Sequence, residues 1–217
     1  VGLGVFWLTK QLISITKWKN EKAKTELMLL KSQVNPHFFF NMLNNLYGLV
    51  GKDAKKGQEL ILKLSDMMRY SIYEGERDFV SLKEEVDYLQ NYIELHKMRY
   101  HKEIDVQFDV QIVDEYRVMP LLFIILLENA FKHGISTKNK SWIRISLRCL
   151  KGSVHLDVVN SIHPKKQTED PRDESGIGLE NVKNRLAHSY PQKHNITIVA
   201  NDTEHFVHLY KTIDPFS

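Results

Sequence analysis

The chain has 217 residues, of which 42% are hydrophobic and 26% are charged. This composition is typical of a globular chain with one large or two small domains, and it excludes a disordered tail. The single cysteine, Cys149, excludes an intrachain disulfide and fits a reducing cytoplasm, and the sequence contains no CxxC or HExxH spacing that would indicate a metal site.

The net charge of +3 is concentrated near the start of the chain. The first residues, VGLGVFWL, are apolar, and between Lys10 and Lys31 six lysines stand against two glutamates, which leaves the remaining chain at −1. We interpret this start as the end of a transmembrane helix with lysines on its cytoplasmic side, because a full span needs about 20 apolar residues. The alternative is the amphipathic start of a soluble protein. No basic stripe interleaved with aromatics follows, so nucleic-acid binding is not expected.

Helical periodicity covers residues 16–50, with an interruption at Pro36 and plausible ends near Gly48 and Gly51. A second apolar stripe over 56–73 follows after a short loop, which predicts an antiparallel neighbour. Two helices cannot enclose a core alone. Dimerisation into a four-helix bundle would bury their apolar faces.

His37 lies in the stretch QVNPHFFFN, where the spacing of Leu27, Leu30 and Val34 would place it on an apolar helix face. One interpretation is a buried histidine that is hydrogen-bonded to a neighbour. However, Pro36 disrupts the helix beside it, and four asparagines crowd the same segment against helix propensity. Local rules broken together favour a functional site.

A third helix is expected from Ser81, where Ser81 and Glu84 form a capping-box pattern, to Tyr100. An alternation of helices and strands follows, which predicts a mixed domain. Its expected elements are strand 104–110, helix 120–133 ending at Gly134, strand 143–149, a turn at 151–152, strand 154–160, loop 161–175, a helix in GIGLENVKNRL, and strands 195–200 and 205–211.

The motif LLENAFKHG places Glu128, Asn129, Lys132 and His133 at the polar end of an otherwise apolar helix. Buried polar groups need partners, and magnesium with phosphates would supply them. Asn129 offers an oxygen to a hard cation such as Mg²⁺, and Lys132 offers a positive charge to phosphate.

Two further features point to a nucleotide. In SGIGLEN, Gly176 and Gly178 would let backbone amides approach an anion at a helix N-terminus, although glycines that merely form a turn are the alternative. Strand alternation places Asn160 at the inner end of its strand, at a position suited to the edge of adenine.

LKSQVNPHFFFNMLNNL resembles the phosphoacceptor box of LytS/YehU-type sensor histidine kinases, whose usual form is LxxQxNPHFLFNxLN. The resemblance implies that His37 receives the γ-phosphoryl group of ATP. Farther along, ENAFKHG, Asn160 and GIGLENVKNRL resemble the N-box, adenine-contacting box and glycine box of the GHKL ATPases, in the same order. The combination is specific although each box alone is not.

The resemblance implies an α+β chain. A helical hairpin would form a dimeric four-helix bundle, followed by an α/β sandwich of the GHKL (Bergerat) type with helices on one face of a mixed sheet. It assigns 1–24 to the membrane end and signalling helix, 25–78 to dimerisation and phosphoacceptance, and 79–217 to ATP binding. It implies ATP and Mg²⁺ as cofactors, with the nucleotide bound by Asn129, Lys132, His133, Asn160, Gly176, Gly178 and Leu179.

By the same resemblance, the chain is the cytoplasmic core of a two-component kinase at the bacterial inner membrane. It would act as a homodimer and pass the phosphoryl group to an aspartate of a response regulator, of LytTR type by family. Glu128 is our candidate for polarising the attack, and Asn41, one turn after His37, is our candidate for orienting a water in dephosphorylation.

The sequence departs from the pattern at Asn160, Ser161 and Ile162, where the relatives usually have Asp, Asn and Gly. An amide oxygen can still accept from adenine, but it lacks the carboxylate's charge, so weaker ATP affinity is expected. The alternative is therefore a dimeric pseudokinase that binds ATP and signals by conformation. In a third interpretation, a helical membrane scaffold, both ATP motifs are coincidental.

Overall fold

The computed structural model describes residues 36–100, 104–113, 115–136, 139–163 and 177–212. The predicted membrane end, the helical seam of Leu27, Leu30 and Val34, and Gly176 lie outside these residues. Within them, no helix has the length and apolar character needed to cross a membrane.

The described chain begins with an antiparallel helical hairpin, α2 (Pro36–Val50) and α3 (Ala54–Arg69). Proline suits the first position of a helix, where its missing N–H has no intrahelical partner in any case. Asp53 caps α3 by accepting a hydrogen bond from the Lys56 N–H at 3.1 Å. The two helices contact each other, and Phe38, Phe39 and Met42 of α2 and Leu60, Leu64 and Met67 of α3 are all buried.

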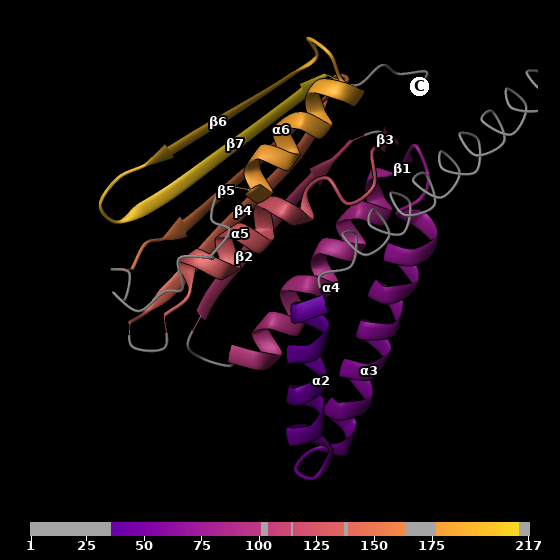
Figure 1. The fold of residues 1–217 in the computed structure, drawn as a ribbon, viewed down its shortest axis with the longest axis vertical. Coiled ribbons are helices and arrows are strands. Elements are labelled where there is room, and N and C mark those ends of the chain that lie inside the picture. Colours follow the sequence, from indigo (N-terminus) through magenta and orange to yellow (C-terminus); the bar gives the residue numbers. More distant parts are fainter. Residues whose placement is uncertain (1–35, 101–103, 114, 137–138, 164–176, 213–217) are drawn as a thin grey trace, which may run out of the picture.

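Helix α3 continues into a short π-helix, η1 (Tyr70–Glu74), and then a two-residue strand, β1 (Val80–Ser81), leads to α4 (Leu82–Tyr100). The predicted capping box is confirmed. Glu84 accepts from the Ser81 N–H at 2.9 Å, and the Lys83 N–H donates to Ser81 Oγ at 3.2 Å. Figure 1 shows α4 between the hairpin and the sheet, and it contacts both.

The main sheet has five strands in the order β2-β4-β5-β7-β6. Only the β2–β4 pair is parallel among these neighbours, so the sheet is mixed, as predicted. Lys151 and Gly152 form the predicted turn with positive φ angles of 49° and 75°. The strands are β2 (Ile104–Ile112), β4 (Ser141–Leu150), β5 (Ser153–Ser161), β6 (His194–Ala200) and β7 (Glu204–Thr212). A separate strand, β3 (Arg117–Val118), pairs with β1.

Helices α5 (Ile124–Gly134) and α6 (Ile177–Ser189) cover one face of this sheet, with α4 beside them (Figure 1). The core lies between the helices and the inner residues of the strands, such as Ile143, Leu156 and Leu209, each fully buried. The predicted α+β class with helices on one face of a mixed sheet is confirmed.

The helix predicted from Pro120 begins only at Ile124, so its predicted start is wrong. Leu121 has φ of 55°, which lies in the left-handed region and cannot continue a right-handed helix. Residues 120–123 instead form a turn before α5.

Candidate functional site

His37 lies in the first turn of α2 with an exposed side chain. The buried residues of this turn are its neighbours Phe38 and Phe39, so the expectation that His37 shares the apolar face does not hold within one chain. Asn41 Nδ2 lies 3.2 Å from Nε2 and 3.3 Å from Nδ1 of His37. The amide one turn later therefore faces the imidazole, and an unprotonated ring nitrogen can accept its hydrogen.

Phe38 anchors this turn to the sheet domain. Its ring centroid is 4.8 Å from that of Tyr92 and 5.3 Å from that of His96, both on α4. His96 in turn stacks on Phe131 of α5 at 4.2 Å. A continuous set of rings, hereafter the ring cluster (Phe38, Tyr92, His96 and Phe131), thus joins the helix of His37 to the helix that carries the ENAFKHG motif.

His96 was not identified from the sequence. Its side chain is 6% exposed, and neither ring nitrogen has a hydrogen-bond partner among the described residues. Burial, with a smaller contribution from the positive charge of Arg99, lowers the pKa of His96 to about 3. The imidazole is therefore neutral and packs against the neighbouring rings as an aromatic side chain does. Its helical spacing from Leu89 and Tyr92 was the only available signal.

Helix α5 presents its polar residues as the motif predicted. Glu128 and Asn129 are half-buried, whereas Lys132 and His133 are exposed. Glu128 lies close to the tyrosines of α4: burial is the main cause that raises the pKa of Tyr92, and the Glu128 carboxylate raises it further. Glu128 therefore belongs to the α4–α5 junction, on the side of the ring cluster.

Asn160 lies at the inner end of β5 with a 1% exposed side chain, as strand alternation predicted. Its Nδ2 donates to the Ser161 carbonyl oxygen at 2.9 Å. A Cβ on Gly134 would lie 2.8 Å from the Asn160 Cβ, so the glycine that ends α5 makes room for this asparagine. Ser161 Oγ donates to the Gly134 carbonyl at 3.0 Å and thereby fixes the same junction.

The glycine motif is described only in part. Gly178 lies in the first turn of α6, and Leu179, half-buried, packs against the core. Helix α6 contacts α5, and both helices lie in the layer that covers one face of the sheet (Figure 1). The glycine motif at the start of α6 and the polar residues of α5 therefore belong to the same layer.

The donor set fits Mg²⁺ and a nucleotide. Asn129 Nδ2 is buried and has no hydrogen-bond partner in the part of the chain that the structure describes. Such a group is costly unless another molecule completes its bonding. An amide that can turn either its oxygen or its nitrogen to a ligand, on the same helix as the exposed Lys132, suits a metal-bound phosphate.

Comparison with known proteins agrees with the motifs. Residues 25–104 match the family described as Histidine kinase. The sensor protein LytS of Enterococcus faecalis is 28% identical over 201 residues, which cover 87% of this chain and 34% of that protein. LytS of Staphylococcus saprophyticus is 31% identical over 74% of this chain and 29% of that protein. The sensor histidine kinase BtsS of Escherichia coli K12 is 26% identical over 91% and 36%.

The chain thus spans about a third of the length of these sensor proteins. Among solved structures, the histidine kinase AdeS of Acinetobacter baumannii superposes with a TM-score of 0.45 and 15% identity, covering 80% of this chain and 93% of that one.

Proposed function

Since the chain is a relative of the LytS-type sensor histidine kinases, we propose that it is the kinase part of such a sensor and phosphorylates its own His37 with ATP. The observation that carries the proposal is the exposed imidazole of His37 on a helix that Phe38 docks against α4, where His96 stacks on Phe131 of the ENAFKHG motif.

In the proposed reaction a ring nitrogen of neutral His37 attacks the γ-phosphorus of ATP. The N–P bond forms, the bond from the γ-phosphorus to the bridging oxygen breaks, ADP leaves with that electron pair, and the other ring nitrogen releases its proton. Catalysis of such a transfer depends mainly on positioning and charge neutralisation. Lys132 would bind phosphate, Asn160 would accept from the adenine amino group, and Asn129 would hold Mg²⁺. When bound, Mg²⁺ would neutralise phosphate charge.

Glu128 fits a role beside His37 less directly than the sequence alone suggested, because its carboxylate lies near the tyrosines of α4. We propose that it orients the α4–α5 junction and polarises the attack when the nucleotide is bound. His133, exposed beside Lys132, and the backbone from Gly176 and Gly178 to Leu179 would complete the phosphate side of the site.

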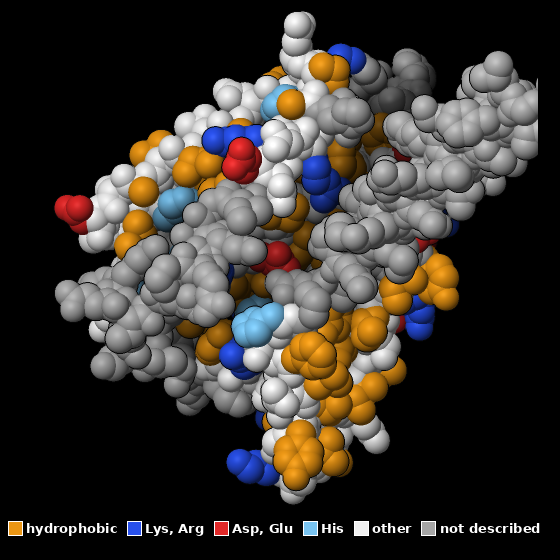
Figure 2. Space-filling model, in the orientation of Figure 1, with side chains coloured by type: hydrophobic (Ala, Val, Ile, Leu, Met, Phe, Trp, Pro, Cys, Tyr) orange, Lys and Arg blue, Asp and Glu red, His pale blue; other side chains and the backbone are white. Residues whose placement is uncertain are grey.

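The proposed domains are the helical hairpin within 25–78 and the ATP-binding domain within 79–217. Large apolar side chains remain exposed along the hairpin and gather there in Figure 2. They include Phe40 at 67%, Tyr47 at 89% and Leu62 at 66%. A second copy of the chain would cover them in a four-helix bundle. Light scattering tests this. We expect the mass of the chain to rise with concentration to that of a dimer, and Tyr47→Glu to shift it back to the monomer. A monomer at all concentrations would contradict the proposal.

We also propose a response-regulator aspartate, of LytTR type, as the next acceptor, and a location at the inner membrane with this part in the cytoplasm. These proposals are supported by the relatives, which are sensor proteins. The kinase itself is tested by incubating the chain and His37→Gln with γ-labelled ATP and Mg²⁺. Label that is acid-labile, alkali-stable and lost in His37→Gln is expected.

A pseudokinase is the second candidate, and Asn160 is the observation that favours it. Its amide replaces the carboxylate usual at this position in the relatives, and it already donates to the Ser161 carbonyl. ATP binding without any label, in a chain shown to be dimeric, would establish the pseudokinase and overturn the kinase.

A further inference from the structure

Glu85 of α4 is fully buried at the junction of the hairpin and the sheet domain. Its Oε1 accepts from the Tyr70 hydroxyl at 2.6 Å and from the Leu121 N–H at 2.7 Å. Tyr70 opens η1, at the end of the hairpin, and Leu121 lies in the turn that leads into α5. One carboxylate oxygen therefore joins the two parts of the chain.

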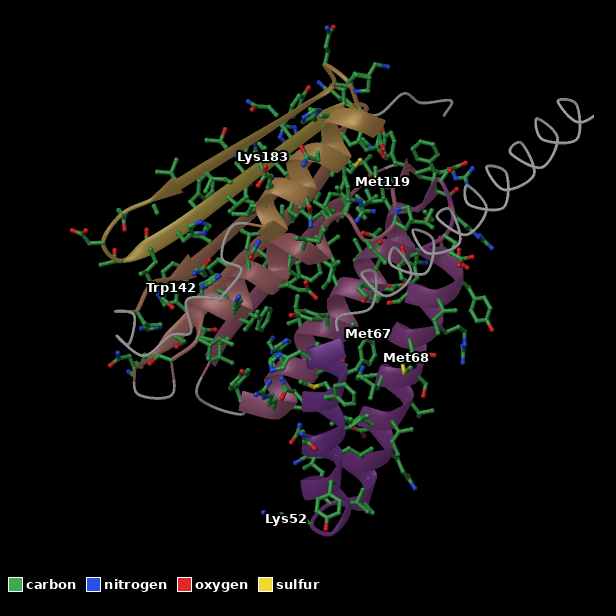
Figure 3. All side chains as sticks on the ribbon, viewed as in Figure 1. Lys52, Met67, Met68, Met119, Trp142 and Lys183 are labelled. Carbon is green, nitrogen blue, oxygen red and sulfur yellow. The ribbon has the colours of Figure 1, made fainter. Side chains whose placement is uncertain are left out.

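The turn at Leu121 is strained and is held from two sides. Leu121 has φ of 55°, a conformation that a leucine adopts only when its surroundings impose it. From α6, Arg185 donates to the Leu121 carbonyl at 3.2 Å and to the Pro120 carbonyl at 2.9 Å. The Nη2 of Arg185 also lies 3.2 Å from the sulfur of Met119, which Figure 3 labels. Through Glu85 and Arg185, helices α4 and α6 thus hold the residues from which α5 starts. We call Glu85, Arg185 and the Leu121 turn the clamp.

The hairpin reaches this clamp through a π-helix. Tyr70 and Ser71 are consecutive, yet both contact α4: Tyr70 bonds Glu85, and Ser71 Oγ lies 3.1 Å from the Tyr88 hydroxyl. The rings of Tyr70 and Tyr88 also pack with centroids 4.9 Å apart. Single π-turns are uncommon and occur often at functional sites. Here the π-turn directs two neighbouring side chains onto one helix.

The electrostatics of the clamp depend on its burial. Burial raises the pKa of Glu85, while the Tyr70 hydroxyl, the Leu121 amide and the positive charge of Arg185 lower it. Burial also lowers the pKa of Arg185. The carboxylate and the guanidinium therefore depend on each other and on the turn between them, because each would be unfavourable there alone.

We propose that Glu85 is a positioning residue for phosphoryl transfer, which couples the hairpin to the ATP site by binding Tyr70 and the Leu121 amide with one oxygen. A movement of η1 changes the bond from Tyr70 and so changes the hold on the turn before α5, which carries Asn129 and Lys132. The catalytic part of this inference rests on the proposed kinase function. The structural coupling does not.

Tyr70→Phe is the discriminating variant, because it removes one hydroxyl and keeps the ring on Tyr88. Tyr73→Phe is the matched control, since Tyr73 belongs to the same π-helix and is 68% exposed. We expect Tyr70→Phe to lower kcat for autophosphorylation at least fivefold with KM for ATP within twofold, because Glu85 and Arg185 still hold the turn. Equal kcat in Tyr70→Phe and Tyr73→Phe would overturn the proposal.

Glu85→Ala supplies a second measurement. It removes the oxygen that accepts from Tyr70 and Leu121 and also the negative charge near Arg185, so both kcat and KM should worsen. Tyr70→Phe should add less than twofold in that background. If the double variant instead loses kcat by the product of the two single effects, Tyr70 does not act through the Glu85 oxygen.

Hydrogen exchange separates this inference from the kinase proposal because it needs no activity. In Tyr70→Phe the Leu121 amide should exchange at least threefold faster than in Tyr73→Phe. A chain that takes no label from ATP yet shows this difference would refute the kinase and retain the coupling. Unchanged exchange in a chain that is labelled on His37 would refute the coupling and retain the kinase.

Discussion

The hairpin and the sheet domain differ in how completely one chain buries them. In the sheet domain Ile143, Leu147 and Leu156 are fully buried, and α5 and α6 close the inner face. In the hairpin, Tyr47 is 89% exposed although it is one of the largest apolar residues of α2. The sheet domain therefore completes its own core, whereas the hairpin depends on surfaces outside itself, on α4 and, in our proposal, on a second copy.

Several buried polar groups that lack a hydrogen-bond partner in the described part of the chain lie on α2 and α4, although Asn129 Nδ2 of the sheet domain is another. Among the described residues, Asn45 Nδ2, Glu85 Oε2 and both nitrogens of His96 are buried without a hydrogen-bond partner, on α2 or on the face of α4. Buried groups of this kind oppose folding. The contact between the hairpin and α4 is thus less favourable than it would be between purely apolar side chains.

The largest effect is expected where a single side chain connects the two regions. Phe38→Ala should destabilise the chain by about 3–4 kcal/mol in urea unfolding, because it removes a 5% exposed ring that packs on Tyr92 and His96. Phe40→Ala, two residues on and 67% exposed, is the control. Phe40→Ala should lower the free energy of unfolding only at protein concentrations at which the chain forms dimers. If Phe38→Ala loses less unfolding free energy than Phe40→Ala at concentrations at which the chain is a monomer, the hairpin does not dock through the ring cluster.

The next effect concerns pH and His96. The unfolded chain binds a proton at this histidine near pH 6.5, whereas the folded chain binds it only near pH 3, so stability should fall as the pH decreases through this range. From one histidine the expected loss is about 2 kcal/mol between pH 7 and pH 5. His96→Phe keeps a ring and removes the proton, so its stability should change less over this interval.

His37→Gln, which removes an exposed imidazole, is the matched control for that measurement. Equal slopes for His96→Phe and the unmodified chain would mean that the ring cluster opens before His96 is protonated. In that case the cluster does not hold the two regions together.

A third effect belongs to the sheet domain alone. Asn160→Asp should tighten ATP binding about tenfold in calorimetry, because a carboxylate makes the stronger, charge-assisted bond to the adenine amino group. Without nucleotide the same change should reduce stability, since a buried carboxylate cannot donate to the Ser161 carbonyl as the amide does. Asn195→Asp, the same change on the exposed strand β6, is the control. Unchanged affinity would place adenine away from Asn160.

Local pattern was sufficient to predict much of this structure. The capping box of Ser81 and Glu84, the turn at Lys151 and Gly152, and the inward position of Asn160 all depend on neighbours within a few residues. The clamp at Leu121 could not be predicted in this way, because its partners Tyr70, Glu85 and Arg185 are 36 to 64 residues away. Long-range partners also hold Leu121 at a positive φ, which leucine propensity disfavours, and so delay the start of α5.

The burial of individual polar residues was equally hard to predict. Glu85 and His96 occupy the apolar face of α4 at ordinary helical spacing, and only the packing of α2, η1 and α5 against that face explains them. By contrast, the motifs around His37 and Asn129 stood out because several residues of unusual type lie close together in the sequence.

The smallest expected effect lies at Asn41, on the exposed side of the hairpin. Its amide faces the His37 ring at 3.2 Å. If, as we propose, it orients a water against phosphohistidine, Asn41→Ala should lengthen the lifetime of the phosphorylated chain about threefold. Asn44→Ala, exposed on the same helix, should leave the lifetime unchanged. The measurement is the decay of label after removal of ATP. If Asn41→Ala and Asn44→Ala decay alike, the amide contributes only to the orientation of the imidazole. The hairpin would then supply the acceptor, and hydrolysis would depend on groups from outside it.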